Sequence, residues 1–516
     1  MSRDSVRPER TLSPESFVLL KAGSVERAKG KSKDERRYDF MKHTLVLVSI
    51  LLLFLPSSAL RSEAKDLTDV LVRGFSFSAF GKDTSASARA VAPAFSSAIA
   101  QAVTQEFPFA SVTPAFIYRY NPAVDIYERL TGIPGPLFSE RAPTLGKGRF
   151  NLGVGYAYID FSDLNGTDLD NINSPALLNE LFLTEGIPFG QLSTGEPTFL
   201  APVSASLIRT GIDLQAYVIV PTLRYGITDN WDVSLSIPIV NTSLRIRNEV
   251  KRVADVDFSR VGFAFAGNNE NSLRPLGFFD RAGNPIRDLS LIPLVKSQRS
   301  TQLLRKASGS ATGVGDITLR SKYYLWQQEF GGAALGLNLQ LPSGEVQDFH
   351  GTDETHLTTF LYLSQVLWER FEPHLNVGVD FNADDVDRSS FVYTAGTVFL
   401  MGEKLGVIID FLGRVEFSGL SVRVPPEGIY TQGLKLNRPA DTCTTTQPCA
   451  PDLTKGFRAF PFFPEKIQRN DLADFSFGLR YALGASGSIF FGGVIPLNDD
   501  GFRPDFIPAG GIEYTF

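Results

Sequence analysis

The chain has 516 residues, of which 43% are hydrophobic and 21% are charged, and its formal net charge is −6. This acidic balance argues against a nucleic-acid-binding protein, which would carry basic patches. A mean hydropathy of −0.01 excludes a membrane protein built from many apolar helices. Glycine (45) and phenylalanine (41) are abundant, whereas cysteine (2) and histidine (4) are scarce. The composition favours an all-β protein outside the reducing compartments, and we expect neither an enzyme nor a cofactor.

Residues 41–64 have the three parts of a secretory signal peptide. Residues 41–43 form a short basic start, residues 44–55 are almost wholly apolar, and small residues precede a cleavage site near Ala64. The apolar run is too short for a membrane-spanning helix, which needs about 20 residues. We therefore expect cleavage near Ala64, and we expect residues 1–40 to be a non-native or disordered extension outside the fold.

Residues 65–148 differ in character from the rest of the chain. Phe95, Ile99 and Val103 have helical spacing within an alanine-rich stretch, residues 115–129 could form a hairpin, and residues 131–148 are rich in glycine and proline. Three interpretations remain open: a plug inside a barrel lumen, a periplasmic extension, or an added strand pair. The irregular stretch that directly follows Tyr120 favours a plug or an extension.

From residue 149 onward, apolar residues alternate with small or polar ones. Residues 334–341 are representative, because four leucines alternate there with alanine, glycine, asparagine and glutamine. One apolar and one polar face is the pattern of a half-buried strand. The pattern predicts twelve strands, near residues 149–161, 214–227, 231–247, 313–326, 332–343, 357–368, 371–381, 389–400, 404–416, 472–483, 487–497 and 507–516. In the strands at 357–368 and 389–400 both faces carry apolar residues, so their inward side stays unassigned.

The lengths of the connections distinguish a soluble sandwich from a membrane barrel. Short connections at 228–230, 327–331, 369–370, 401–403 and 484–486 alternate with longer ones at 162–213, 248–312, 344–355, 382–388, 417–471 and 498–506. Bacterial outer-membrane barrels have short periplasmic turns and long outer loops, whereas a Greek-key sandwich has no reason for this alternation. We therefore predict an all-β fold. It is a transmembrane antiparallel barrel of about twelve strands (fourteen as the alternative) over residues 149–516, in the outer membrane of a Gram-negative bacterium.

Aromatic residues mark the boundaries of the predicted membrane span. Trp231, Trp326 and Trp368 all lie beside the short turns, where a half-apolar, half-hydrated ring is favoured. Strict alternation would turn Trp326 inward, so its assignment rests on position alone. The chain ends in a strand closed by Phe516, which is typical of the segment that the barrel-assembly machinery recognises.

The predicted inward face carries charges of both signs. It comprises Arg224, Asp232, Asp316, Arg320, Lys322, Glu372, His374, Asp380, Asp410, Arg414, Glu416, Arg480 and Glu513. Such a face could form a hydrated lumen lining that filters solutes or holds a plug. The alternative is a structural network in which buried charges only satisfy one another.

Pro221 and Pro238 are nearly symmetric about the turn at Asp229 and should lie close together on neighbouring strands. Proline lacks the donor that a central strand needs. We consider a side exit for an apolar solute here, with a simple bulge as the alternative.

Two outer loops carry residues that could bind metal or form a crosslink. His350, Asp353 and Glu354, with His356 close by, match no ligand spacing, so we expect a solvated loop and no metal. Cys443 and Cys449 are close in sequence and predict a local disulfide in an oxidising compartment.

The chain resembles a bacterial family of outer-membrane transporters associated with the meta-pathway of phenol degradation. The resemblance extends from about residue 85 to the C-terminus. It is carried by residues 136–141 (PLFSER) leading into 148–153 (GRFNLG), 221–229 (PTLRYGITD), 313–317 (GVGDI) and 496–501 (PLNDDG) with the end at Phe516. The family is distantly similar to fatty-acid and aromatic-hydrocarbon channels of the outer membrane, which have fourteen strands and an N-terminal hatch. The resemblance implies passive uptake of small hydrophobic, including aromatic, compounds.

Two other classes of function are alternatives to a channel. A structural or adhesive barrel would act through its long outer loops. An enzyme would need a positioned nucleophile and base, and His374, well inside a strand, has no Gly-x-Ser-x-Gly elbow to accompany it. We therefore expect a channel whose partners are the outer-membrane lipids, the assembly machinery and a small hydrophobic solute.

Overall fold

The computed structural model describes residues 66–75, 85–105, 114–121, 123, 126–129, 132–179, 187–191, 197–201, 203–266, 274–287, 291–296, 302–328, 331–418, 471–484 and 486–516. The predicted extension (1–40), the predicted signal peptide (41–64) and the predicted disulfide between Cys443 and Cys449 lie outside these residues. Among the helices described, none is both long enough and apolar enough to cross a membrane.

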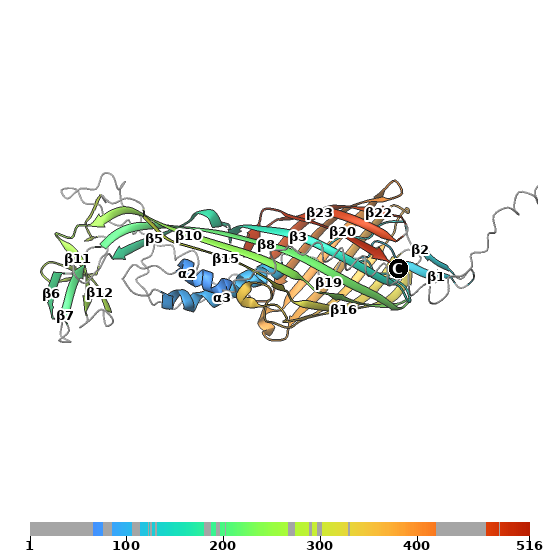
Figure 1. The fold of residues 1–516 in the computed structure, drawn as a ribbon, viewed down its shortest axis with the longest axis horizontal. Helices are drawn as coiled ribbons and strands as arrows, with labels where there is room; N and C mark the ends of the chain where they lie inside the picture. The colour runs from blue at the N-terminus through green and yellow to red at the C-terminus, as the bar shows by residue number, and fades with distance from the viewer. Residues whose placement is uncertain are drawn as a thin grey trace, which may run out of the picture. The chain divides into compact units, whose positions relative to one another are not determined.

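A closed antiparallel barrel of twelve strands dominates the structure (Figure 1), which confirms the predicted fold class. The barrel closes because the last strand pairs with the first, with Gly511 opposite Gly155. Two of the barrel strands are each described as two consecutive segments. The strands are β3 (Phe150–Leu164), β8 (Val203–Thr228), β9 (Trp231–Ser236) continued by β10 (Ile239–Val256), β15 (Gln302–Val314) continued by β16 (Ile317–Gln328), β17 (Gly331–Leu341), β18 (His356–Gln365), β19 (Phe371–Asn382), β20 (Ser390–Met401), β21 (Leu405–Glu416), β22 (Leu472–Leu483), β23 (Gly487–Pro496) and β25 (Ile507–Thr515).

The alternation of the sequence becomes an apolar outer surface and a polar inner one. Large outward side chains are strongly exposed, among them Leu335 (48%), Phe411 (50%) and Phe491 (64%), whereas inward polar residues such as Asp410 (0%) are buried. A water-soluble protein would bury the first set. In a barrel this outer band meets lipid, so the fold is that of a transmembrane barrel.

The structure assigns the two strands whose inward faces the sequence left open. In both strands the fully buried residues are even-numbered, such as Tyr362 of β18 and Val398 of β20, whereas Phe391 and Phe399 of β20 are exposed. Both faces of these strands are apolar because their inward apolar residues pack against other segments inside the barrel.

Three of the predicted loops, 162–213, 248–312 and 498–506, contain strands. The connections predicted at 162–213 and 248–312 are wrong in part, because β8 already begins at Val203, β10 continues to Val256 and β15 begins at Gln302. These strands extend past the length that a bilayer requires, about 9–11 residues. The further elements here are β4 (Thr167–Asp168), η2 (Leu169–Asn171), β5 (Ile172–Asn179), β14 (Leu294–Lys296), β24 (Phe502–Pro504) and a separate sheet in the order β13 (Pro285–Ile286), β12 (Arg274–Asp280), β11 (Val261–Ala266), β7 (Pro197–Ala201) and β6 (Ile187–Gln191).

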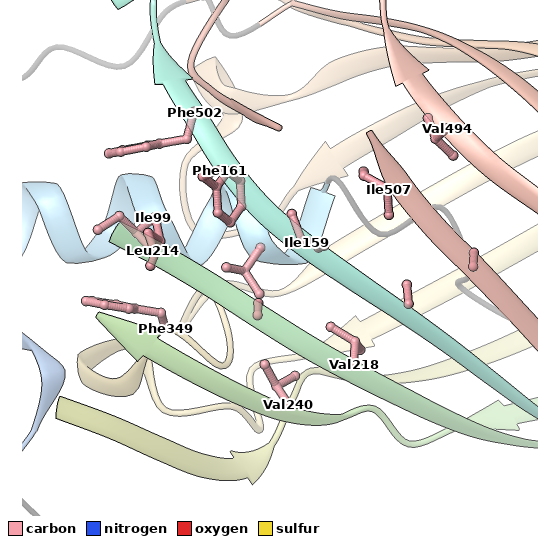
Figure 2. Packing of buried hydrophobic residues seen from close by; sticks show 14 of the residues in the cluster. Ile99, Ile159, Phe161, Leu214, Val218, Val240, Phe349, Val494, Phe502 and Ile507 are labelled. Atoms are coloured by element: carbon pink, nitrogen blue, oxygen red, sulfur yellow. The ribbon is translucent and has the colours of Figure 1, made fainter. Parts of the chain in front are cut away.

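Two helices pack at the end of the barrel that carries the long loops. The predicted helix forms as α3 (Ser85–Gln105), and the shorter α2 (Leu67–Phe75) was not predicted. Figure 2 shows Ile99 of α3 among apolar side chains of the barrel strands, including Leu214 of β8. The helices therefore cover an apolar patch that would otherwise face water.

The hairpin predicted between residues 115 and 129 forms as β1 (Tyr118–Asn121) and β2 (Ile126–Arg129). It is a separate two-stranded sheet and does not join the barrel, so the fourteen-strand alternative is wrong. Short 3₁₀ turns, η4 (Val346–Asp348) and η5 (Val386–Arg388), lie in two of the long loops.

Candidate functional site: the charged interior of the barrel

Residues 133–146, here called the inner segment, are buried and contact inward side chains of many barrel strands. The Ala142 amide donates to Ser364 Oγ of β18 at 3.0 Å, and the Leu145 amide donates to Asp232 Oδ2 of β9 at 3.0 Å. A Cβ atom on Gly478 of β22 would lie 2.2 Å from Leu137 Cδ1, so glycine is needed where Leu137 packs. The inner segment thus touches widely separated parts of the barrel wall.

Glu140 of the inner segment binds three cationic side chains of the wall. Its carboxylate accepts from Arg224 of β8 at 2.5 and 3.2 Å, from Arg320 of β16 at 2.7 Å and from Lys322 of β16 at 3.0 Å. All four side chains are at most 8% exposed. Lys322 Nζ also donates to the carbonyls of Arg141 and Pro143. Charge-assisted bonds of this kind are stronger than neutral ones.

Other predicted inward residues are also buried and paired. Arg141 of the inner segment donates to Glu372 Oε2 at 2.7 Å. His374 Nε2 lies 2.5 Å from Asp410 Oδ1, which also accepts from Ser139 Oγ at 3.3 Å.

Arg480 lies 4.0 Å from Glu513. Glu513 in turn accepts from the backbone amide of Ala115, just ahead of the β1–β2 hairpin. Glu416 accepts from Gln101 of α3 at 3.0 Å. These pairs link the barrel wall to residues that precede it in the chain.

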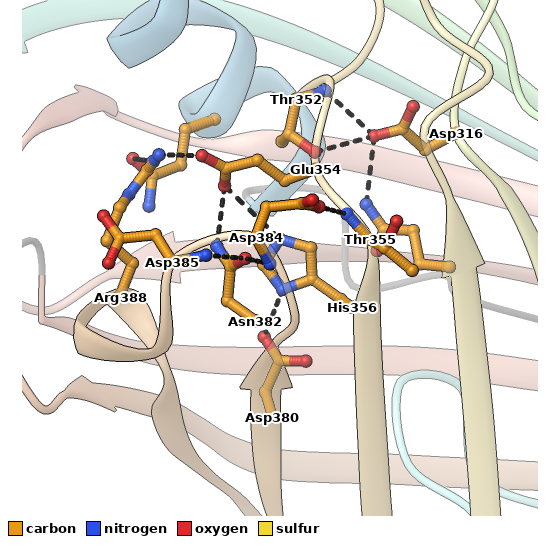
Figure 3. Close-up of polar contacts among 12 residues, drawn as sticks. Asp316, Thr352, Glu354, Thr355, His356, Asp380, Asn382, Asp384, Asp385 and Arg388 are labelled. Carbon is orange, nitrogen blue, oxygen red and sulfur yellow. Dashed lines mark hydrogen bonds and ion pairs between the residues drawn. The ribbon is translucent and has the colours of Figure 1, made fainter.

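At the end of the barrel that carries the long loops, a polar network joins the loops over residues 342–355 and 383–389 to the neighbouring strands (Figure 3). Asp316 accepts from the amide and the hydroxyl of Thr352 at 2.9 and 3.0 Å, and Asp380 accepts from Arg414 at 3.0 Å and bonds His356 Nδ1 at 3.0 Å. This network holds the loop over residues 342–355 against the barrel.

Glu354 lies in the same network, where it accepts from Asn382 at 2.8 Å and pairs with Arg388. Burial raises the pKa of its carboxyl, but the hydrogen bond with His356 and the charge of Arg388 outweigh this effect and hold the pKa of Glu354 below its usual range.

The expectation of a solvated loop is wrong for the two histidines, because His350 and His356 are only 3% and 8% exposed. Burial lowers the pKa of His350, and Asp348 opposes that shift less strongly. Among the described residues, no group of three or more potential ligands has metal-binding geometry.

The three tryptophans are exposed on the outer surface, at 39% for Trp231, 64% for Trp326 and 82% for Trp368. Trp326 points outward because the pairing of β16 with β17 shifts by one residue between Tyr324 and Trp326. This bulge reverses the alternation that would have turned the ring inward. The Phe516 amide bonds the Phe150 carbonyl at 2.8 Å, which holds the C-terminus at the start of β3.

Pro221 and Pro238 lie on hydrogen-bonded neighbouring strands, as predicted. The Ile237 amide still donates to the Pro221 carbonyl at 3.1 Å, and the Gly315 amide donates to the Pro238 carbonyl at 2.8 Å. Next to this site, Gly315 and Asp316 separate the end of β15 from the start of β16. A side exit here stays a prediction.

Sequence reasoning missed the partners that the inner segment contributes. Glu140 and Arg141 were noted only as part of a family motif, and Arg503, which pairs with Asp474, was not considered. The sequence does contain one signal for these partners. Glu140 and Arg141 are adjacent and of opposite charge in an otherwise apolar, proline-rich stretch, and the barrel that follows has cationic residues at inward positions.

Comparison with known proteins supports the family resemblance over part of the chain. Residues 202–402 match the family model described as "Putative MetA-pathway of phenol degradation". Among curated proteins, none matches the chain.

The chain is similar to three solved structures of membrane proteins. An outer membrane channel from Pseudomonas putida F1 shares 11% identity, with a TM-score of 0.35 over 73% of this chain and 98% of that one. A FadL homologue from Pseudomonas aeruginosa shares 10%, with a TM-score of 0.27 over 72% and 89%. The toluene transporter TbuX from Ralstonia pickettii shares 13%, with a TM-score of 0.21 over 72% and 89%.

Proposed function

We propose that this protein is an outer-membrane channel for the passive uptake of small hydrophobic compounds, and that the inner segment closes its lumen. The observation that carries the proposal is the binding of Glu140 by Arg224, Arg320 and Lys322 inside the barrel. A segment that is bound inside the barrel by several charge-assisted contacts would obstruct the lumen. Solute would pass when the inner segment moves.

The apolar character of the solute is supported by the inner wall near the long loops. There the inward side chains are Ile159, Leu214, Val218 and Val240, each at most 3% exposed and in one apolar cluster with Ile99 of α3 (Figure 2). An apolar solute that displaces part of α3 would find an apolar surface in its place. The family match over residues 202–402 agrees with this proposal.

The proposal includes the cellular setting. A closed barrel with an apolar outer band and aromatic residues beside its short turns suits the outer membrane of a Gram-negative bacterium. The C-terminal strand that ends at Phe516 would engage the barrel-assembly machinery during insertion.

The uptake of solutes by liposomes containing the purified full-length protein tests the proposal. We expect uptake of small neutral aromatic solutes, and faster uptake by the double variant Glu140→Gln/Arg141→Gln, because both side chains then lose their ionic contacts. Arg245→Gln is the matched control, since Arg245 is 63% exposed and its ion pair with Asp213 lies outside this network. Uptake no faster than through protein-free liposomes would contradict the proposal.

The long β8–β10 pair favours a second candidate, a surface-binding barrel. Its pairing runs from Ile239–Ile219 to Asp255–Ser204, well beyond one membrane span. A protein of this kind would bind a surface ligand yet show no solute uptake in the same liposomes.

A further inference from the structure

A cavity of about 170 Å³ lies beside the inner segment, within the barrel. Phe138, Ser139 and Glu140 line it from the inner segment, and Gln105, the last residue of α3, lines it too. Its other lining residues belong to strands from β16 to β23. If the protein is the channel proposed above, this cavity lies on the route of the solute, and the following inference rests on that proposal.

The cavity has the size and lining of a site for one aromatic ring. Phe360 and Tyr362 of β18 stack at 5.4 Å with 17° between their planes, and Leu412 and Val494 add aliphatic surface. A cavity of about 150 Å³ with apolar walls is known to hold benzene.

Three polar side chains that line the cavity have atoms without a hydrogen-bond partner. These atoms are Arg320 Nε, the Tyr362 hydroxyl and Asn338 Oδ1. The residues are only 8%, 2% and 6% exposed. A buried polar group without a partner is unfavourable, so a ligand that accepts from Arg320 Nε and the Tyr362 hydroxyl gains free energy on binding.

The charge near Arg320 favours an anionic ligand. Arg224, Arg320 and Lys322 surround Glu140, and Asp232 lies opposite Lys322 in the register of β9 and β16. Three cations against two carboxylates leave one positive charge uncompensated.

The remaining charged groups that line the cavity are already paired. Arg414 donates to Asp380 at 3.0 Å, and Asp474 pairs with Arg503. They neither add to nor cancel the positive charge beside Arg320.

We propose that this cavity binds a small aromatic carboxylate. Its ring would lie among Phe138, Phe360 and Leu412, and its carboxylate would accept from Arg320 Nε and the Tyr362 hydroxyl. The carboxylate of Glu140, bound by Arg320 at 2.7 Å, is a group of the same chemistry in the adjoining position. The channel would then favour aromatic acids over neutral aromatic compounds of the same size.

Calorimetric titration of the full-length protein in detergent tests this proposal, with benzoate, benzyl alcohol and acetate as probes. We expect benzoate to bind at least tenfold more tightly than either of the other two, because only benzoate supplies both ring and charge. Tyr362→Phe should weaken benzoate binding severalfold, and Arg320→Gln should weaken it more. Leu412→Trp should abolish it by filling the cavity while leaving Arg320 in place. Arg245→Gln, with the same change of charge, should leave it unaltered.

The outcomes separate this inference from the proposed function. Absence of benzoate binding, or equal binding of benzoate and benzyl alcohol, would overturn the inference, whereas uptake of neutral solutes by liposomes would still support the channel. Folding of each variant is checked by the altered gel mobility of a heated barrel. Tyr362→Phe removes only one hydroxyl, so it keeps the test decisive if Arg320→Gln fails to fold. Benzoate binding that survives in folded Leu412→Trp would also contradict the proposal.

Discussion

Arg141 donates a hydrogen bond of 2.7 Å to Glu372, while its neighbour Glu140 is bound by cations on the other strands β8 and β16. Two consecutive residues of opposite charge therefore each bind a partner whose charge is opposite to their own. A slip of the inner segment by one residue would bring like charges together. This arrangement fixes the register of the segment inside the barrel more firmly than apolar contacts would.

Arg141→Gln should loosen the inner segment, because it leaves Glu372 buried without its cation. Removing one partner of a buried ion pair typically costs about 3–5 kcal/mol. We expect faster hydrogen exchange at the amides of residues 133–146. In the double variant Arg141→Gln/Glu372→Gln, the increase in exchange should be smaller than the sum of the increases in the two single variants. Increases that simply add would contradict a direct pairing of the two side chains.

Gly336→Ala should destabilise the barrel and disturb the cavity. An added Cβ atom would lie 2.3 Å from Cε2 of Tyr362, so the ring would have to move. Overpacking of this kind costs about 1–3 kcal/mol. Unfolding in urea measures the effect, and Tyr362→Leu should relieve it. Gly132→Ala, with nothing within 4 Å, should change stability little. Equal effects of the two substitutions would argue against the close packing of Gly336 on Tyr362.

The strand count and the inward face could be predicted because alternation along a strand is a local property. The period of two places Asp410, Arg480 and Glu513 on the buried side without any knowledge of distant contacts. The connection lengths then distinguish a barrel from a sandwich.

What the sequence could not show depends on long-range packing. The bulge before Trp326 arises from the pairing of β16 with β17, so alternation within β16 alone would turn the ring inward. Glu140 meets Lys322 across 182 residues of chain, and nothing local to an irregular segment indicates such a partner. The extension of β8 and β10 was missed because strand pairing continues past the membrane through residues with weak alternation.

Trp326 should lie at the lipid boundary because of that bulge. In variants that keep a single tryptophan, we expect lipids with brominated chains to quench Trp326 fluorescence as strongly as they quench Trp231. Trp368, at 82% exposure beside its turn, should be quenched less by lipid and more by iodide. Insensitivity of Trp326 to brominated lipid would contradict its outward orientation.

The loop over residues 342–355 should lose stability as pH falls. Burial lowers the pKa of His350 from its usual value near 6.5, so the folded loop resists a proton that the open loop accepts. Below about pH 6.5 the stability of the loop therefore decreases until the pKa of the folded form is reached. Hydrogen exchange at pH 7.5 and 5.5, corrected for intrinsic rates, measures the change.

His350→Gln is the control for this pH effect, because it removes the titrating ring and keeps His356 and Glu354 in place. The variant should show a smaller increase in loop opening on acidification than the parent protein. An equal increase in both would assign the effect to other groups.

The conductance of single channels with the inner segment tethered to the wall tests most directly whether that segment closes the lumen. The Ala142 amide and Ser364 Oγ are 3.0 Å apart, so the two positions are neighbours at which a disulfide between introduced cysteines is tested. In a background with Cys443 and Cys449 replaced by serine, the oxidised pair should hold the channel closed, and reduction should restore openings. Equal conductance before and after reduction, with the crosslink verified by mass spectrometry, would contradict closure by the inner segment.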